Sequence, residues 1–325
     1  MPTPLLVPTP AGLYCPPGDF HIDPTRRVPR AVITHGHSDH ARKGHGAVLA
    51  TAETLAVMAV RYGANFAGAR QALRYGQRLT LGDVNLRLVP AGHVLGSAQV
   101  LIENADMRAV VSGDYKRRAD PTCPAFEPVA ADLFVTEATF AMPIFVHPPA
   151  ETEIARLMRS LALFPQRPHV LVAYSLGKAQ RLIALLRAAG YDRPIHVAAA
   201  PLELCTLYEH FGIRLGPLLP LESAHPSDLA GGIVIGRNEC LRDPVVSFAS
   251  GWMRLRANAK SQGGDLPLII SDHADWPELL QSLDDVGPRE LWITHGREDA
   301  LAHHAGRRGI AAKSLELGFA GESGE

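Results

Sequence analysis

The sequence has few cysteines, no long apolar run and no excess of positive charge, and each absence narrows what the protein can do. No stretch approaches the roughly twenty consecutive apolar residues that a membrane-spanning helix needs, so no membrane association is expected. The four cysteines lie apart without a CxxC pair, which favours reduced thiols in the cytoplasm over a disulfide framework or a zinc ribbon. The formal net charge of −1 counts against a passive nucleic-acid-binding module, but not against an enzyme with a local cleft.

Short apolar segments separated by polar turns fill the first half of the chain and predict a strand-rich domain. Residues 28–34 form an apolar run that ends in a histidine-rich turn, as expected of a buried strand delivering side chains at its carboxyl end. Residues 79–90 alternate between apolar and polar and predict a hairpin that turns at Gly82 and Asp83. Further predicted elements are a helix at residues 52–62 and strands at residues 99–103, 109–111 and 133–136.

The second half alternates strands with helices, which predicts a parallel α/β unit. Helices are predicted at residues 148–164 and 176–189, and strands at residues 169–173, 195–199 and 233–235. Histidine-rich turns return after about residue 245. We therefore expect a β-rich catalytic domain at residues 1–145 and 246–325, with an α/β domain inserted at residues 146–245.

The most specific signal is the HxHxDH motif at residues 35–40. Three imidazoles and a carboxylate within six residues match the nitrogen and oxygen donors that borderline divalent metals prefer. On an irregular turn, His35 and His37 can face one metal while Asp39 and His40 face a second. A surface histidine-rich loop without metal is the less favoured interpretation.

Two later segments supply what a two-metal site would still need. His93 lies among glycines in AGHVLGSA, where the backbone can approach a ligand closely. Asp114, in SGDY, follows a predicted strand and offers a carboxylate that could bridge two metals. Each signal is weak alone, and the two gain weight from following the HxHxDH motif in this order.

The order of Asp23, the HxHxDH motif, His93, Asp114 and a late histidine resembles the metallo-β-lactamase superfamily. The stretch AGHVLGSA resembles the nucleic-acid-processing branch of that superfamily, the β-CASP nucleases. The resemblance implies an α/β (α+β) fold, a four-layer αββα sandwich with an inserted α/β β-CASP domain. Within that branch the chain is most similar to the bacterial DNA ligase-associated exonucleases, with features of the Artemis- and Apollo-like nucleases and of the mRNA 3′-end-processing factors.

The same resemblance implies a role for each matched residue. His35, His37 and His93 would bind one of two divalent metal ions, Asp39, His40 and His295 the other, and Asp114 would bridge them. Asp23 would orient a ligand histidine. His273, in SDHAD, would act as the general acid together with Glu137, in TEAT. The ligand types suit zinc best and also allow manganese.

Residues 173–178 leave a predicted strand and open a helix, with Ser175, Gly177 and Lys178 at the start of that helix. A helix N-terminus with a hydroxyl, a glycine and a lysine suits a phosphate, although a capped helix with a surface lysine fits equally well. The stretch resembles the YSxGK segment of the Artemis- and Apollo-like nucleases, which lies near a pocket for a terminal phosphate. The basic residues 116–118 could contact a nucleic-acid backbone or form a solvated surface.

These features together predict a metal-dependent phosphodiesterase that acts on nucleic acid. A DNA exonuclease in repair or end processing is favoured, and the resemblance implies association with a DNA ligase and a helicase. His295 resembles the late histidine of RNA-processing members such as RNase J, so RNA processing is the alternative. Two alternatives come from other classes. A glyoxalase II-type thioesterase or lactonase would not need the inserted domain, Glu137 or the His273 segment. A pseudo-nuclease that serves as a scaffold would typically lack metal ligands, whereas every ligand position is filled here.

Overall fold

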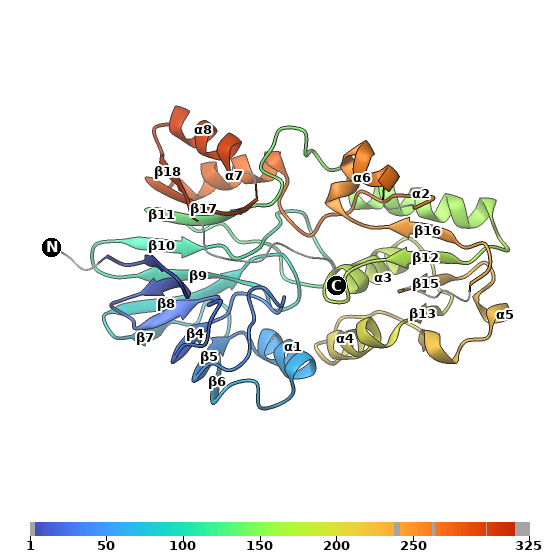
Figure 1. The fold of residues 1–325 in the computed structure, drawn as a ribbon, viewed down its shortest axis with the longest axis horizontal. Helices are drawn as coiled ribbons and strands as arrows, with labels where there is room; N and C mark the ends of the chain where they lie inside the picture. The colour runs from blue at the N-terminus through green and yellow to red at the C-terminus, as the bar shows by residue number, and fades with distance from the viewer. Residues whose placement is uncertain (1–3, 237–240, 262–263, 297, 316–325) are drawn as a thin grey trace. The chain divides into compact units, whose positions relative to one another are not determined.

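The computed structural model describes residues 4–236, 241–261, 264–296 and 298–315, and the chain divides into two compact units (Figure 1). The first unit takes in the chain up to Ile144 and again from His273, and the second extends from Phe145 to Asp272. The start expected for the insertion is residue 146, and the second unit begins at Phe145. The end expected for the insertion is residue 245, whereas the second unit extends to Asp272, and its β16 (Val245–Phe248) pairs in parallel with β12 (His169–Val172).

Two β-sheets form the centre of the first unit. The six-stranded sheet runs in chain order through β1 (Val7–Thr9), β2 (Gly12–Cys15), β3 (Phe20–Ile22), β4 (Arg30–Val32), β5 (Ala47–Ala50) and β6 (Ala69–Ala72). The seven-stranded sheet has the order β18 (Ala311–Ser314), β17 (Glu290–Gly296), β11 (Leu133–Ala138), β10 (Arg108–Val111), β9 (Ala98–Glu103), β8 (Val84–Pro90) and β7 (Leu79–Leu81). The hairpin predicted at Gly82 and Asp83 is confirmed, since β7 and β8 pair antiparallel across it.

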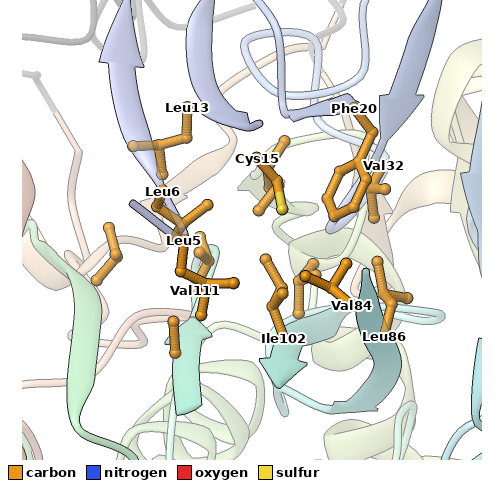
Figure 2. Packing of buried hydrophobic residues seen from close by; sticks show 14 of the residues in the cluster. Leu5, Leu6, Leu13, Cys15, Phe20, Val32, Val84, Leu86, Ile102 and Val111 are labelled. Carbon is orange, nitrogen blue, oxygen red and sulfur yellow. The ribbon is translucent and has the colours of Figure 1, made fainter. Parts of the chain in front are cut away.

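The apolar faces of the two sheets pack against each other. Leu13, Cys15 and Phe20 of the first sheet meet Val84, Leu86 and other strand residues of the second in one buried cluster (Figure 2). The alternation predicted for residues 79–90 has this cause, because every second residue of β8 points into the shared core. Burial raises the pKa of the Cys15 thiol to about 11, so this cysteine is a core residue and not a reactive one.

Helices cover the outer faces of both sheets. On the first, α1 (Ala52–Tyr62) contributes Met58 to a cluster with Ile33 and Val48. On the second, α7 (Trp276–Val286) and α8 (Asp299–Arg307) contribute Leu283 and Leu301 to a cluster with strand residues. The order helix, sheet, sheet, helix confirms the four-layer αββα sandwich expected from the sequence.

The second unit is built on a parallel sheet, as the alternation of strands and helices predicts. Its order is β14 (Leu218–Pro220), β13 (Ile195–Val197), β15 (Ile233–Ile235), β12 and β16. Its helices are α2 (Ala150–Leu163), α3 (Lys178–Ala188), α4 (Ala199–His210), α5 (Pro226–Leu229) and α6 (Arg256–Ser261), with short 3₁₀ turns at Leu221–Ser223 and Gly251–Arg254. Across the described residues, no helix has both the length and the apolar character to cross a membrane.

Candidate metal centre

The HxHxDH motif forms a tight turn just after strand β4. The backbone N–H of His40 and that of Ala41 both donate to the carbonyl oxygen of His37, at 3.2 and 2.7 Å. The turn buries His35 and His40 and leaves His37 and Asp39 partly exposed. Irregular backbone at the end of a short buried strand thus directs four potential ligands to one place.

The side chain of Asp23 fixes this turn through three hydrogen bonds. Its Oδ1 accepts from the backbone N–H of Thr34 at 2.8 Å, and its Oδ2 accepts from the Thr34 hydroxyl at 2.6 Å and from Nδ1 of His40 at 2.7 Å. Asp23 itself has a φ of 43°, in the left-handed region that non-glycine residues rarely adopt. Strain of this kind persists only where surrounding interactions impose it, and here the three hydrogen bonds do so. Asp23 thus contacts the candidate ligand His40, and its role in orienting that ligand stays a prediction.

These hydrogen bonds also fix which ring nitrogens carry protons. Because the Thr34 hydroxyl gives its only hydrogen to Asp23, it must accept from Nδ1–H of His35, 3.0 Å away. Nδ1 of His40 likewise donates to the Asp23 carboxylate. In both rings the lone pair is left on Nε2, the form in which an imidazole binds a metal. The buried Nε2 of His35 has no hydrogen-bond partner.

His295 reaches the site through a bulge in strand β17. The β11–β17 register pairs Glu137 with Thr294 but Ala138 with Gly296, so His295 is the extra residue. A β-bulge changes the direction of a side chain. His295 has a φ of 54°, in the left-handed region, which is energetically unfavourable for a non-glycine residue. The ring of His295 stacks on His40 with 5.1 Å between centroids.

Gly296 shows that this backbone path requires glycine. A Cβ at this position would lie 2.2 Å from the carbonyl oxygen of Ala138 on the adjacent strand. Thr294 determines which nitrogen of the next residue, His295, carries the proton, since its hydroxyl donates to the Thr136 carbonyl oxygen and so accepts from Nδ1–H of His295 at 3.1 Å.

Asp114 lies between the two groups of histidines and turns one oxygen to each. Its Oδ2 is 3.4 Å from Nε2 of His35 and 3.8 Å from Nε2 of His93, while its Oδ1 is 3.5 Å from Nε2 of His40. Two ligands about 2.1 Å from one tetrahedral ion lie about 3.4 Å apart, so these separations suit shared ions. Gly113 allows this approach, because a Cβ there would lie 2.7 Å from the Thr34 side chain.

The predicted ligands therefore converge as two groups joined by one carboxylate. His35, His37, His93 and Asp114 offer ligand atoms within 4.8 Å of one another, and so do Asp39, His40 and His295. Nε2 of His93 and Nδ1 of His37 face each other at 3.0 Å. One of these nitrogens can donate a hydrogen bond to the other, and in the tautomers that leave both lone pairs free the two nitrogens could bind one cation.

The electrostatics of the site call for positive charge. Burial and the nearby Glu137 carboxylate raise the pKa of Asp114 to about 8, against the opposing effect of His40. Burial disfavours the charged form of His40, but Asp114, Asp23 and Asp39 outweigh it and raise its pKa to about 10. Burial and the adjacent His40 ring lower the pKa of His35 well below its usual range. A neutral donor at His35 beside carboxylates that need a counter-charge fits divalent cations.

Glu137 and His273 form a buried pair beside these groups. Nδ1 of His273 lies 2.8 Å from Oε2 of Glu137, and the other carboxylate oxygen accepts from the backbone N–H of Tyr115 at 2.7 Å. The Thr139 hydroxyl also donates to Oε2 of Glu137, at 2.5 Å. The ring of His273 lies 4.8 Å from that of His93 between centroids, so this pair adjoins the first histidine group. Asp114, Glu137 and His273 also converge within 4.8 Å as a third cluster.

The basic residues 116–118 have structural partners within the first unit. Lys116 is fully buried, forms an ion pair with Asp120 at 2.8 Å, and donates from Nζ to the carbonyl oxygen of His93 at 2.6 Å. Arg117 and Arg118 pair with acidic residues of α7 and its N-cap. Lys116 therefore ties the segment that carries Asp114 to the turn that carries His93. This role is not predictable from sequence, because a run of basic residues is typical of a solvated surface.

The residues proposed for a terminal phosphate lie in the second unit, at the start of α3. Lys178 is buried, and its Nζ lies 3.0 Å from Oδ2 of Asp272. The backbone N–H of Gly177 donates to Oε1 of Gln180 at 2.7 Å. A phosphate would have to compete with the carboxylate of Asp272 for the ammonium group. A phosphate site at Ser175, Gly177 and Lys178 stays a prediction.

Comparison with known proteins gives relatives among nucleic-acid enzymes, and no family model matches the chain. A probable DNA ligase of Opitutus terrae is 29% identical over 330 residues, which covers 95% of this chain and 31% of that protein. Endoribonuclease ysh-1 of Neurospora crassa is 31% identical over 148 residues, 42% of this chain and 17% of that protein. Cleavage and polyadenylation specificity factor subunit 3 of Dictyostelium discoideum is 29% identical over 143 residues, 41% of this chain and 18% of that protein.

The chain thus spans about a third or less of the length of these curated relatives. Among solved structures, a protein of unknown function from Enterococcus faecalis V583 superposes with a TM-score of 0.58 at 16% identity, over 88% of this chain and 78% of that one. That likeness shows a shared fold. The resemblance to nucleic-acid-processing nucleases drawn from the motifs is confirmed by the curated relatives.

The contact between Lys116 and His93 yields a test. We expect the double variant Lys116→Met, Asp120→Asn, which removes both buried charges, to bind metal about 10–100-fold more weakly, the usual effect of losing a residue that orients a ligand. Competition with a chelating indicator measures this affinity, and circular dichroism checks the fold. Arg117→Gln, which removes a neighbouring charge from an ion pair with Asp285, is the control and should bind metal normally. Unchanged affinity in a folded double variant would contradict the role of Lys116.

Proposed function

We propose that this chain, a relative of metallo-β-lactamase-fold nucleases with an inserted α/β unit, is a metal-dependent phosphodiesterase that acts on nucleic acid. We propose further that its reaction is exonucleolytic processing of DNA ends in repair. The observation that carries the proposal is Asp114, whose two oxygens face two separate groups of histidines. A carboxylate in that position suits two ions that share one phosphodiester.

Divalent ions held by His35, His37 and His93, and by Asp39, His40 and His295, with Asp114 between them, would supply a water nucleophile of lowered pKa and neutralise the phosphate charge. Nitrogen-rich ligand sets favour zinc, and the two carboxylate ligands, Asp39 and Asp114, would also suit manganese.

His273 is proposed to donate the proton that the leaving oxygen needs. In hydrolysis a water oxygen bonds to phosphorus, the bond from phosphorus to the leaving sugar oxygen breaks, and that oxygen takes up a proton. Because Nδ1–H of His273 donates to Glu137, the second ring nitrogen can carry and release this proton. Glu137 stabilises the protonated ring and is itself held by the backbone N–H of Tyr115 and the Thr139 hydroxyl.

The relatives support nucleic acid as substrate and divide over its type. The match to the probable DNA ligase covers nearly the whole chain and supports DNA, and it also supports association with a DNA ligase. The endoribonuclease and cleavage-factor matches cover less than half of the chain and support RNA as the second candidate. A helicase partner and a cytoplasmic location complete the proposal, the latter supported by the free thiols of Cys15, Cys123 and Cys205.

One assay tests both the substrate and the direction of attack. Metal-loaded protein is incubated with single-stranded DNA and RNA of one sequence, labelled at either end and made with or without a 5′-phosphate. We expect stepwise shortening of the DNA, faster with the phosphate. Internal or preferential cutting of the RNA would replace the first candidate with the second, and inertness towards both strands beside hydrolysis of a thioester would contradict a nuclease.

The acid role of His273 has a distinct signature. His273→Ala should keep both metals and lower turnover by about 10²–10⁴-fold, the usual contribution of general acid catalysis. The decrease in turnover caused by His273→Ala should be smaller with a nitrophenyl phosphodiester as substrate, because nitrophenolate leaves without taking up a proton. The exposed His303 of α8 provides a control, and His303→Ala should behave as the native protein does. Loss of metal in His273→Ala, or an equal loss with both leaving groups, would contradict the assignment.

A further inference from the structure

The near-neutral charge of the whole chain conceals one strongly basic stretch. Residues 24–78 contain nine lysines and arginines, against Asp39 and Glu53 as the only acidic residues. One of these two acids, Asp39, belongs to the candidate metal centre. The stretch comprises strands β4 to β6, helix α1 and the connections between them. Such a concentration of one sign is the electrostatic footprint of a polyanion-binding surface when its members lie together.

The topology of the first sheet brings several of these residues to one edge. Strands β4, β5 and β6 are parallel neighbours, so their amino-terminal ends meet at the same edge of the sheet. Arg27 precedes β4, Arg42 and Lys43 precede β5, and Arg70 is the second residue of β6. We call these four residues the basic edge.

The segments that carry these residues contact one another. A Cβ on Gly44 would lie 2.6 Å from Nε of Arg27, so this guanidinium packs over the backbone next to Lys43. The N–H of Gly44 donates to the carbonyl oxygen of Phe66 at 2.7 Å, and Arg70 lies 5.8 Å from the centroid of the Phe66 ring. The three segments therefore form one surface.

The cations of the basic edge are not neutralised by acids. Within the described residues, Arg27, Arg42, Lys43 and Arg70 form no ion pair, and Arg27, Lys43 and Arg70 are exposed. By contrast, five other arginines of the first unit each have an acidic partner, namely Arg108, Arg117, Arg118, Arg289 and Arg308. Like charges gathered without counter-ions raise the energy of the folded chain, and a bound polyanion would offset that cost.

The basic edge lies at the amino-terminal ends of β4 to β6, whereas the metal turn follows the carboxyl end of β4, and the segment from His40 to Lys43 connects the two. Arg42 follows the candidate ligand His40 by two residues, which places their Cα atoms within about 7 Å. Arg61, in the last turn of α1, donates to the carbonyl oxygen of Gly36, between His35 and His37, at 3.0 Å. A strand that leaves the basic edge and follows this segment over the length of β4 can thus reach the metal turn.

We propose that the basic edge is a docking track for the phosphate backbone of a single-stranded nucleic acid whose scissile phosphate lies at the metal centre. The inference rests on the proposed function and adds the surface that holds the strand beyond the reacting phosphate. Arginine and lysine bind phosphates without reading bases, so DNA and RNA share this track.

The test compares two triple variants that lose the same charge. Arg27→Gln with Lys43→Gln and Arg70→Gln removes three cations of the basic edge. Arg289→Gln with Arg308→Gln and Lys313→Gln removes three cations that are ion-paired in the same unit. Binding of phosphorothioate-linked single strands of DNA and of RNA, which keep their charge and resist cleavage, is followed by fluorescence anisotropy from low to high salt.

Each lost phosphate contact lowers the slope of log affinity against log salt by about 0.7, so the basic-edge variant should lose about 2 from the slope with both strands. Its metal content and its turnover of a dinucleotide should match the native protein. The ion-paired variant should keep the native slope. Equal slopes in the native protein and the basic-edge variant, or equal losses in both variants, would overturn the track. Failure of the native protein to bind or cleave any strand would instead remove the proposed function.

Discussion

The candidate site depends on the carboxylate of Asp23, which accepts hydrogen bonds from Thr34 and from His40 at the same time. Through the Thr34 hydroxyl it also determines the proton position on His35. One residue outside the histidine motif thus fixes a member of each metal-binding group. The left-handed φ of 43° and the burial of Asp23 are tolerated because both of its carboxylate oxygens accept hydrogen bonds.

The packing of the surrounding fold offsets the unfavourable free energy of this arrangement. Left-handed backbone at Asp23 and His295, a bulge in β17 and buried charges at Asp114 and Lys116 each lower stability, by about 1–3 kcal/mol for a strained residue. The apolar core between the two sheets of the first unit is continuous and supplies the opposing stabilisation. The residues that lower stability lie at the ends of the strands of this unit, where the buried strands are followed by turns.

Much of this architecture is predictable from local patterns, and the exceptions have physical causes. The β7–β8 hairpin and α1 follow from periodicity and capping, because both elements bury one face. The position of β16 is not predictable in this way, since its pairing with β12 joins strands far apart in sequence. The histidine motif is recognisable because its ligands are adjacent. His295 is recognisable only by resemblance, as its orientation comes from a bulge set by pairing with β11.

The partners of charged residues are the least predictable feature. Lys116 belongs to a basic run and is nonetheless fully buried against Asp120 and the carbonyl oxygen of His93. Lys43 has the same chemistry and is exposed. The sequence does not separate the two, because burial of a lysine depends on an acid and an acceptor that tertiary packing brings near.

The most direct test of the account is anomalous diffraction from crystals of the metal-loaded protein, recorded at the zinc and manganese absorption edges. The account predicts two peaks, one among His35, His37 and His93 and one among Asp39, His40 and His295, with Asp114 between them. A single peak, or a peak held by Glu137 and His273, would contradict both the two-metal site and the assignment of His273 as the acid.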